Sequence, residues 1–145
     1  MPFRFKMQKV LDYRAQLEEE AKVRLADAEH KLRQAQERLD AILAEVAAAE
    51  EKSRSAGLLN SGERWLHEQY LKGLHGDVKQ AELQLRMQKE LAEEARKYLA
   101  ERAMERKLLE KLKERQKAQY LHAERQQEQH FNDEISTLRY KASAF

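Results

Sequence analysis

The side chains best suited to chemistry in this sequence are five histidines and one run of three glutamates. The histidines of two pairs are each eight residues apart, which is more than two turns of a helix, so neither pair can hold one metal ion locally. The sequence contains no cysteine, which excludes thiolate ligands and a thiol nucleophile. We therefore interpret the histidines as surface or helix-seam residues: His30, His67, His75, His122 and His130.

The glutamate run, Glu18–Glu20, is interpreted as a solvated helix face, because a slender helical rod offers no cleft that would raise a carboxyl pKa. The sequence has no glycine-rich phosphate loop, no nucleophile elbow and no HExxH pattern. We predict that the protein is not an enzyme and that it holds no cofactor and no metal.

Composition indicates which elements could position any functional residue. Charged residues make up 37% of the 145 residues, whereas there are only four glycines and one proline. Sandwiches, barrels and doubly wound sheets need many more turn residues, so the composition predicts an all-α protein. No apolar run approaches the 18 residues of a membrane span, and the N-terminus lacks the apolar stretch of a secretory signal. The lack of cysteine suits a reducing cytosol.

Apolar residues recur at alternating spacings of three and four, which is typical of a coiled-coil seam. Toward the N-terminus from Leu25, the same spacing gives Ala21, Glu18, Arg14, Leu11 and Met7. Glu18 and Arg14 are polar residues at seam positions, which we call seam faults. The first series is Leu25, Ala28, Leu32, Ala35, Leu39, Ile42, Val46 and Ala49, and the second is Leu71, Leu74, Val78, Ala81, Leu85, Gln88, Ala92, Ala95 and Leu99.

All four glycines fall between Gly57 and Gly76, so the chain is expected to turn once. We predict one domain over residues 1–145: a helix over about 4–56, a turn over about 57–62 and a helix over about 63–140. Gly57 would end the first helix, and Asn60 or Ser61 would cap the second. Two long helices joined by a short turn form an antiparallel coiled-coil hairpin, in which residue i lies beside roughly residue 119 − i. Residues after about Gln119 would then lack a partner from the first helix.

Charge is distributed unevenly, although the net charge is only +2. Residues 1–14 carry four basic residues and one acidic residue, and residues 96–125 carry ten basic and five acidic. Hairpin pairing would place these two segments side by side and make that end of the rod basic, which favours oriented docking on a partner. Glutamates interleaved through residues 96–125 indicate intrahelical ion pairs rather than a nucleic-acid surface.

The start of the second predicted helix is unusually apolar. A two-helix rod can bury only part of this group, and the remainder would suit a partner site. The alternative is a small cluster that seals the hairpin turn. The group comprises Trp65, Leu66, Tyr70, Leu71 and Leu74.

The opening residues Phe3–Arg14, followed by Glu18–Glu20 and Leu25–Ala28, resemble the start of the FliJ family. The stretch from Arg64-Trp65 through Gln69-Tyr70-Leu71 to Val78 is similar to the start of that family's second helix, and Asn132–Arg139 is similar to its end. The FliJ family contains small components of the bacterial flagellar type III export apparatus, and the resemblance covers most of the chain.

The resemblance implies a stalk-like antiparallel coiled coil that engages and stimulates the hexameric export ATPase ring. It also implies docking on the cytoplasmic domain of the export gate membrane protein and a chaperone-escort role. The protein would be cytoplasmic and peripherally associated with the inner membrane at the flagellar base, without binding nucleic acid or inserting into the membrane. The alternative is a generic coiled-coil scaffold or homodimerising adaptor.

The resemblance assigns two sets of site residues. Tyr70 and Leu74 match the family pattern for gate docking, whereas Asp77 and Ala81 occupy the neighbouring face but differ in residue type. The expected gate-binding set is Trp65, Tyr70, Leu74, Asp77 and Ala81, and the expected ATPase-ring set is Phe3, Phe5, Lys6, Lys9, Arg106, Lys111 and Lys113.

Overall fold

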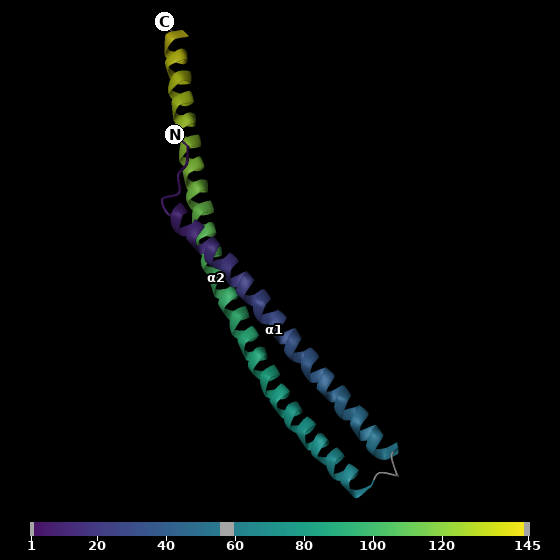
Figure 1. Ribbon diagram of the computed structural model, residues 1–145. Coiled ribbons are helices and arrows are strands. Elements are labelled where there is room, and N and C mark those ends of the chain that lie inside the picture. Colours follow the sequence, from purple (N-terminus) through teal and green to yellow (C-terminus); the bar gives the residue numbers. More distant parts are fainter. Residues whose placement is uncertain (1, 56–59, 144–145) are drawn as a thin grey trace. The chain divides into compact units, whose positions relative to one another are not determined.

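The computed structural model describes residues 2–55 and 60–143 and contains two long helices (Figure 1). Helix α1 spans Gln8–Ser55 and helix α2 spans Ser61–Ser143. The two helices pack against each other, and the described ranges contain no strand, which confirms the all-α prediction. Residues 57–59 of the predicted turn, Gly57 included, lie outside the described residues.

The chain divides into two compact units. Unit 1 comprises Met1–Glu18 and Glu101–Phe145, and unit 2 comprises Glu19–Ala100. Each unit therefore contains part of α1 and part of α2.

The predicted seam is the buried face of both helices from Leu11 onward, whereas Met7 precedes α1 and is exposed. Every residue of the two apolar series is buried or partly buried, as coiled-coil packing requires. In unit 2 these residues form two hydrophobic clusters, one around Leu39, Ala81 and Leu85 and the other around Val46, Ala49 and Leu74. Alanines at several seam positions bury little area, so the larger aliphatic side chains contribute most of the hydrophobic stabilisation.

Contacts in each unit run in opposite chain directions along the two helices. In unit 2, Val46 clusters with Leu74, and Leu39 clusters with the later Leu85. In unit 1, Arg14 pairs with Glu105, and the earlier Phe3 lies against the later Tyr120. These pairs fall within a few residues of the predicted register.

Helix α1 begins at Gln8, four residues after the predicted start, and residues 2–5 are not helical. The Gln8 backbone N–H donates to the Phe5 carbonyl at 3.1 Å, which closes a turn before the helix. Phe5 is buried, and the Phe3 ring lies 5.7 Å from the Tyr120 ring. These aromatic contacts compensate for the helical turn that residues 4–7 do not form.

Helix α2 begins with a side-chain cap. The Asn60 side-chain oxygen accepts a hydrogen bond of 2.8 Å from the Glu63 backbone N–H, and its backbone oxygen accepts one from the Arg64 N–H. Asn60 is therefore the N-cap. Glu63 stands at the third helical position, where its negative charge interacts favourably with the positive end of the helix dipole. Of the two predicted capping residues, Asn60 and Ser61, the structure uses Asn60.

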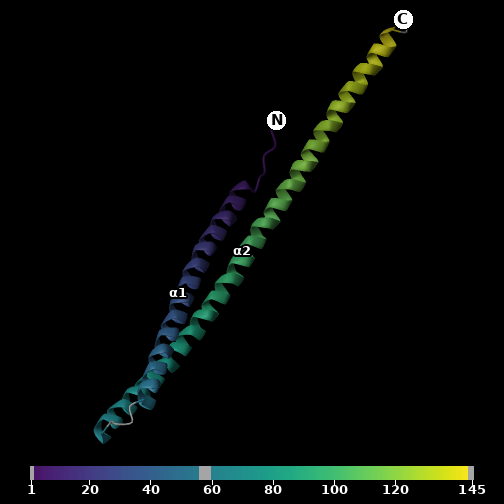
Figure 2. The same cartoon turned by 90° about the vertical axis from the view of Figure 1, so that its right-hand side faces the viewer.

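The end of α2 extends beyond its contacts with α1 in unit 1 (Figure 2). Tyr120 still meets Phe3, but most side chains from residue 121 to residue 143 are exposed. Large apolar side chains here include Phe131, Leu138 and Tyr140, which are each more than half exposed. The prediction that residues after about Gln119 lack an α1 partner agrees with this exposure.

Gly73 and Gly76 lie inside α2, and a Cβ atom added at either position would meet no atom within 4 Å. We expect Gly73→Ala and Gly76→Ala each to raise the free energy of unfolding by about 0.5–1 kcal/mol, because alanine loses less backbone entropy in a helix. Urea denaturation followed by circular dichroism measures the change. A loss of stability in either variant would contradict the open environment of these positions.

Candidate partner-binding surfaces

The first surface lies at the start of α2, where three large apolar side chains face solvent. Trp65, Leu66 and Tyr70 are 59%, 63% and 53% exposed. We call these three residues the aromatic face. The aromatic face is suited to binding another protein, because tryptophan and tyrosine bury a large area and have few rotatable bonds.

The remaining residues of the expected gate-binding set lie in two different environments. Leu74 and Ala81 are buried at 5% and 4% exposure and belong to the two hydrophobic clusters of unit 2. Asp77 is exposed. The structure therefore leaves Trp65, Tyr70 and Asp77 accessible, whereas Leu74 and Ala81 hold α2 against α1.

His67, which the sequence indicates only as a surface or helix-seam residue, contacts α1. Its Nε2 lies 3.0 Å from the Ala49 backbone oxygen, so the ring donates a hydrogen bond to a carbonyl near the end of α1. The bond therefore joins the first turns of α2 to α1 six residues before α1 ends. The part of α2 that carries the aromatic face is thereby bonded to α1.

The second surface lies in unit 1 and consists of Lys6, Lys9, Lys111 and Lys113, which we call the basic end. The first three side chains are exposed and Lys113 is partly buried. The Phe3–Tyr120 and Arg14–Glu105 contacts bracket this stretch on both helices. Positions 6–9 therefore lie at the same level of unit 1 as positions near 111–113, so the four lysines add positive charge at this level.

The two aromatic residues of the expected ring-binding set are engaged within unit 1. Phe5 is buried, and the partly buried Phe3 packs on Tyr120 at an interplanar angle of 46°. The Tyr120 hydroxyl donates to Glu124 at 3.3 Å. Loss of hydration, and then the charge of Glu124, raises the pKa of Tyr120 above its ordinary value, so this hydroxyl stays protonated near neutral pH.

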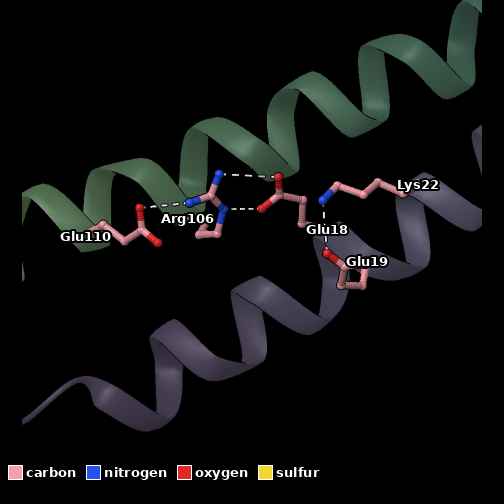
Figure 3. Close-up of polar contacts among 5 residues, drawn as sticks. All are labelled: Glu18, Glu19, Lys22, Arg106 and Glu110. Atoms are coloured by element: carbon pink, nitrogen blue, oxygen red, sulfur yellow. Dashed lines mark hydrogen bonds and ion pairs between the residues drawn. The ribbon is translucent and has the colours of Figure 1, made fainter.

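Arg106 is enclosed by carboxylates rather than open to a partner (Figure 3). Its Nε donates to Glu18 of α1, its Nη2 lies 3.4 Å from the other oxygen of that carboxylate, and its Nη1 lies 2.8 Å from Glu110. Hydrogen bonding to Glu18, and then to Glu110, raises the pKa of Arg106 further above its ordinary value. The guanidinium therefore works within the helix pair.

Glu18 is 7% exposed, so its interpretation as part of a solvated face is wrong. The neighbouring Glu19 is exposed and pairs with Lys22 at 3.0 Å, as a surface glutamate does (Figure 3). Glu18 differs because it occupies a seam position, where only a paired charge is tolerated. Glu18 is therefore a seam fault, as predicted, and Arg106 supplies the positive charge that pairs with it.

The second seam fault, Arg14, is also paired across the helices. It contacts Glu105 at 2.5 Å, and Glu105 lies 3.2 Å from Arg102 one helical turn away. Glu105 thus joins an intrahelical pair, as predicted, to a pair between helices that was not predicted. The signal was available, because the predicted register already places Arg14 opposite residue 105.

Across residues 2–55 and 60–143, no three histidine, aspartate or glutamate side chains gather as metal ligands. Neither α1 nor α2, as described, contains a segment apolar and long enough to cross a membrane.

Comparison with known proteins identifies the family. A family model described as "Flagellar FliJ protein" matches residues 3–144, which is nearly the whole chain. Comparisons with curated proteins and with solved structures gave no match. The family match agrees with the paired helices and with the resemblance of the opening residues. The chain therefore belongs to the FliJ family of flagellar export apparatus components.

Proposed function

We propose that this protein is a stalk-like antiparallel coiled-coil hairpin that engages the flagellar export ATPase ring and stimulates it. Family membership supports this role, and the carrying observation is the exposure of Lys6, Lys9 and Lys111 in unit 1. Stimulation would arise by mass action, since a ligand that binds the assembled ring better than free subunits favours assembly.

The basic end would provide the ring contact by charge complementarity. Exposed lysines steer association and set orientation without needing a deep pocket. Phe5 and Arg106 would contribute indirectly, because the first is buried and the second is held by Glu18 and Glu110. Direct contact is therefore assigned to the exposed lysines.

Reversing the exposed lysines tests this role. We expect Lys6→Glu with Lys9→Glu and Lys111→Glu to raise the concentration needed for half-maximal ATPase stimulation by about tenfold or more, because like charges would then oppose docking. The measurement is the ATP hydrolysis rate of the cognate export ATPase, titrated with wild-type and variant protein.

A matched variant reverses three exposed lysines of unit 2: Lys79→Glu, Lys89→Glu and Lys97→Glu. This control should leave half-maximal stimulation within about twofold, since rim charges outside an interface contribute little. A flat hydrolysis rate across micromolar wild-type protein would reject the stimulation role. Equal effects of the two triple variants would reject the assignment to the basic end.

We further propose that the aromatic face docks on the cytoplasmic domain of the export gate protein, which would place the chain in the cytoplasm beside the inner membrane. The exposure of Trp65 and Tyr70 supports this assignment, and Asp77 lies exposed nearby in α2. Leu74 and Ala81 would act by holding the helix that presents these side chains. A chaperone-escort role is proposed from family membership alone.

The alternative function is a generic scaffold that homodimerises. Leu83, Met87 and Leu91 favour it, because they form an exposed apolar stripe along unit 2 at spacings of one helical turn. Sedimentation equilibrium separates the two proposals. A mass near 17.2 kDa supports the monomeric stalk, and a stable dimer supports the scaffold.

A further inference from the structure

Charged residues interrupt the seam of unit 1 at successive positions on both helices. Arg14 and Glu18 occupy the α1 side, and Arg102 and Arg106 continue the three-and-four spacing of α2 beyond Leu99. Two groups of ion pairs result, which we call the polar layer: Arg14, Glu105 and Arg102 in one, and Glu18, Arg106 and Glu110 in the other.

The polar layer does not stabilise pairing as an apolar seam would. Removing two charges from water costs several kcal/mol, and their attraction offsets that cost only in favourable geometry. The exposed fractions of the Arg14 and Glu105 side chains, 34% and 33%, show that water still reaches this group. Interactions between partly exposed charges weaken as salt increases.

Apolar burial is also distributed unevenly between the units. Among the described residues of unit 1, the buried hydrophobic ones are Phe5 and Leu11, whereas both hydrophobic clusters lie in unit 2. We call residues 2–18 the arm, which comprises the first turns of α1 and the segment before it. The arm thus depends mainly on ion pairs and on the contact between Phe3 and Tyr120. Regions with few buried apolar contacts open locally at lower free energy than the core.

We propose that the arm detaches from residues 101–120 of α2 as one cooperative step while unit 2 stays paired, and that the polar layer is the latch that holds it. Detachment uncovers the seam residues of α2 that are now partly buried, including Leu109, Leu112 and Tyr120. An increase in ionic strength, or a charged segment competing for Arg106, shifts the arm toward the detached state.

Amide hydrogen exchange detects this step directly. Residues 8–18 form the first turns of α1, and a helix end without packing contacts frays, so detachment exposes these amides to exchange. We expect raising salt from about 0.05 M to about 1 M to accelerate exchange in residues 8–18 several-fold, because the Debye length falls to about 3 Å. Amides of residues 39–49 in unit 2 should change much less and serve as the internal reference.

Two matched substitutions isolate the latch. Arg106→Gln leaves Glu18 buried without its cation and should accelerate exchange in residues 8–18 by about tenfold or more at low salt. Arg96→Gln is the control, since Arg96 makes an exposed pair with Glu29 of α1 at 3.7 Å in unit 2. The control should change exchange around residue 29 by less than about twofold.

A third variant distinguishes a latch from a merely structural pair. Glu18→Leu with Arg106→Leu fills the seam with apolar side chains, so it should slow exchange in residues 8–18 and reduce its salt dependence. Simultaneous exchange of residues 8–18 and 39–49 under all salt conditions would overturn the proposal. Equal effects of Arg106→Gln and Arg96→Gln, or an unchanged salt response in the double-leucine variant, would also overturn it.

Discussion

Replacing Leu85 with alanine should lower the free energy of unfolding by about 2–3 kcal/mol. Leu85 is 8% exposed and packs with Leu39 and Ala81, where the neighbouring alanines cannot fill the space it would leave. A two-helix seam has no second layer of side chains to move inward, so the lost contacts are not replaced. Urea denaturation followed by circular dichroism at 222 nm measures the change.

The matched control is Leu83→Ala, two residues away on the same helix and 52% exposed. This substitution should alter the unfolding free energy by no more than about 0.5 kcal/mol, since the side chain buries little area and alanine is a good helix former. Similar losses in both variants would show that the seam described for unit 2 is wrong.

Removing the aromatic face should have the largest effect on partner binding. If the export gate protein docks there, Trp65→Ala and Tyr70→Ala should each weaken binding to its cytoplasmic domain by about thirtyfold, near 2 kcal/mol, as aromatic hot spots do. Both side chains are more than half exposed, so the unfolding free energy should stay nearly unchanged. Isothermal titration calorimetry with the purified domain measures the affinity.

Two further variants separate contact from packing. Tyr140→Ala removes an equally large side chain that is 77% exposed near the end of α2, and it should bind the gate domain normally. Leu74→Ala should instead lower the unfolding free energy, because Leu74 is buried beside Val46 and Ala49. Full gate binding by Trp65→Ala and Tyr70→Ala would reject the aromatic face as the docking site.

The helical seam could be predicted from the sequence because its signal is local and periodic. Leu39, Val46 and Leu85 follow one spacing, and each is buried where that spacing places it. The start of α1 could not be predicted in the same way. Phe5 is buried, and Phe3 packs on Tyr120, which lies more than a hundred positions later in the chain. Long-range packing of this kind overrides the local preference for another helical turn.

Only part of the polar layer could be predicted from the sequence. Arg14 and Glu18 were recognised as breaks in the period, but a break does not reveal what compensates for it. Arg14 lies opposite Glu105 in the predicted register, whereas Glu18 pairs with Arg106, several residues from its predicted opposite position. Long side chains reach along the helix as well as across it, so a register alone cannot assign every pair.

Because the two helices run in opposite directions, the length of chain between two contacting residues differs greatly from one contact to another. The His67–Ala49 hydrogen bond links residues 18 apart, whereas the Arg14–Glu105 pair links residues 91 apart. Closing the longer loop first costs about 1.4 kcal/mol more in chain entropy. Folding should therefore start beside Ala49 and spread stepwise toward Phe3, so the earliest residues to leave the ribosome are the last to acquire their neighbours.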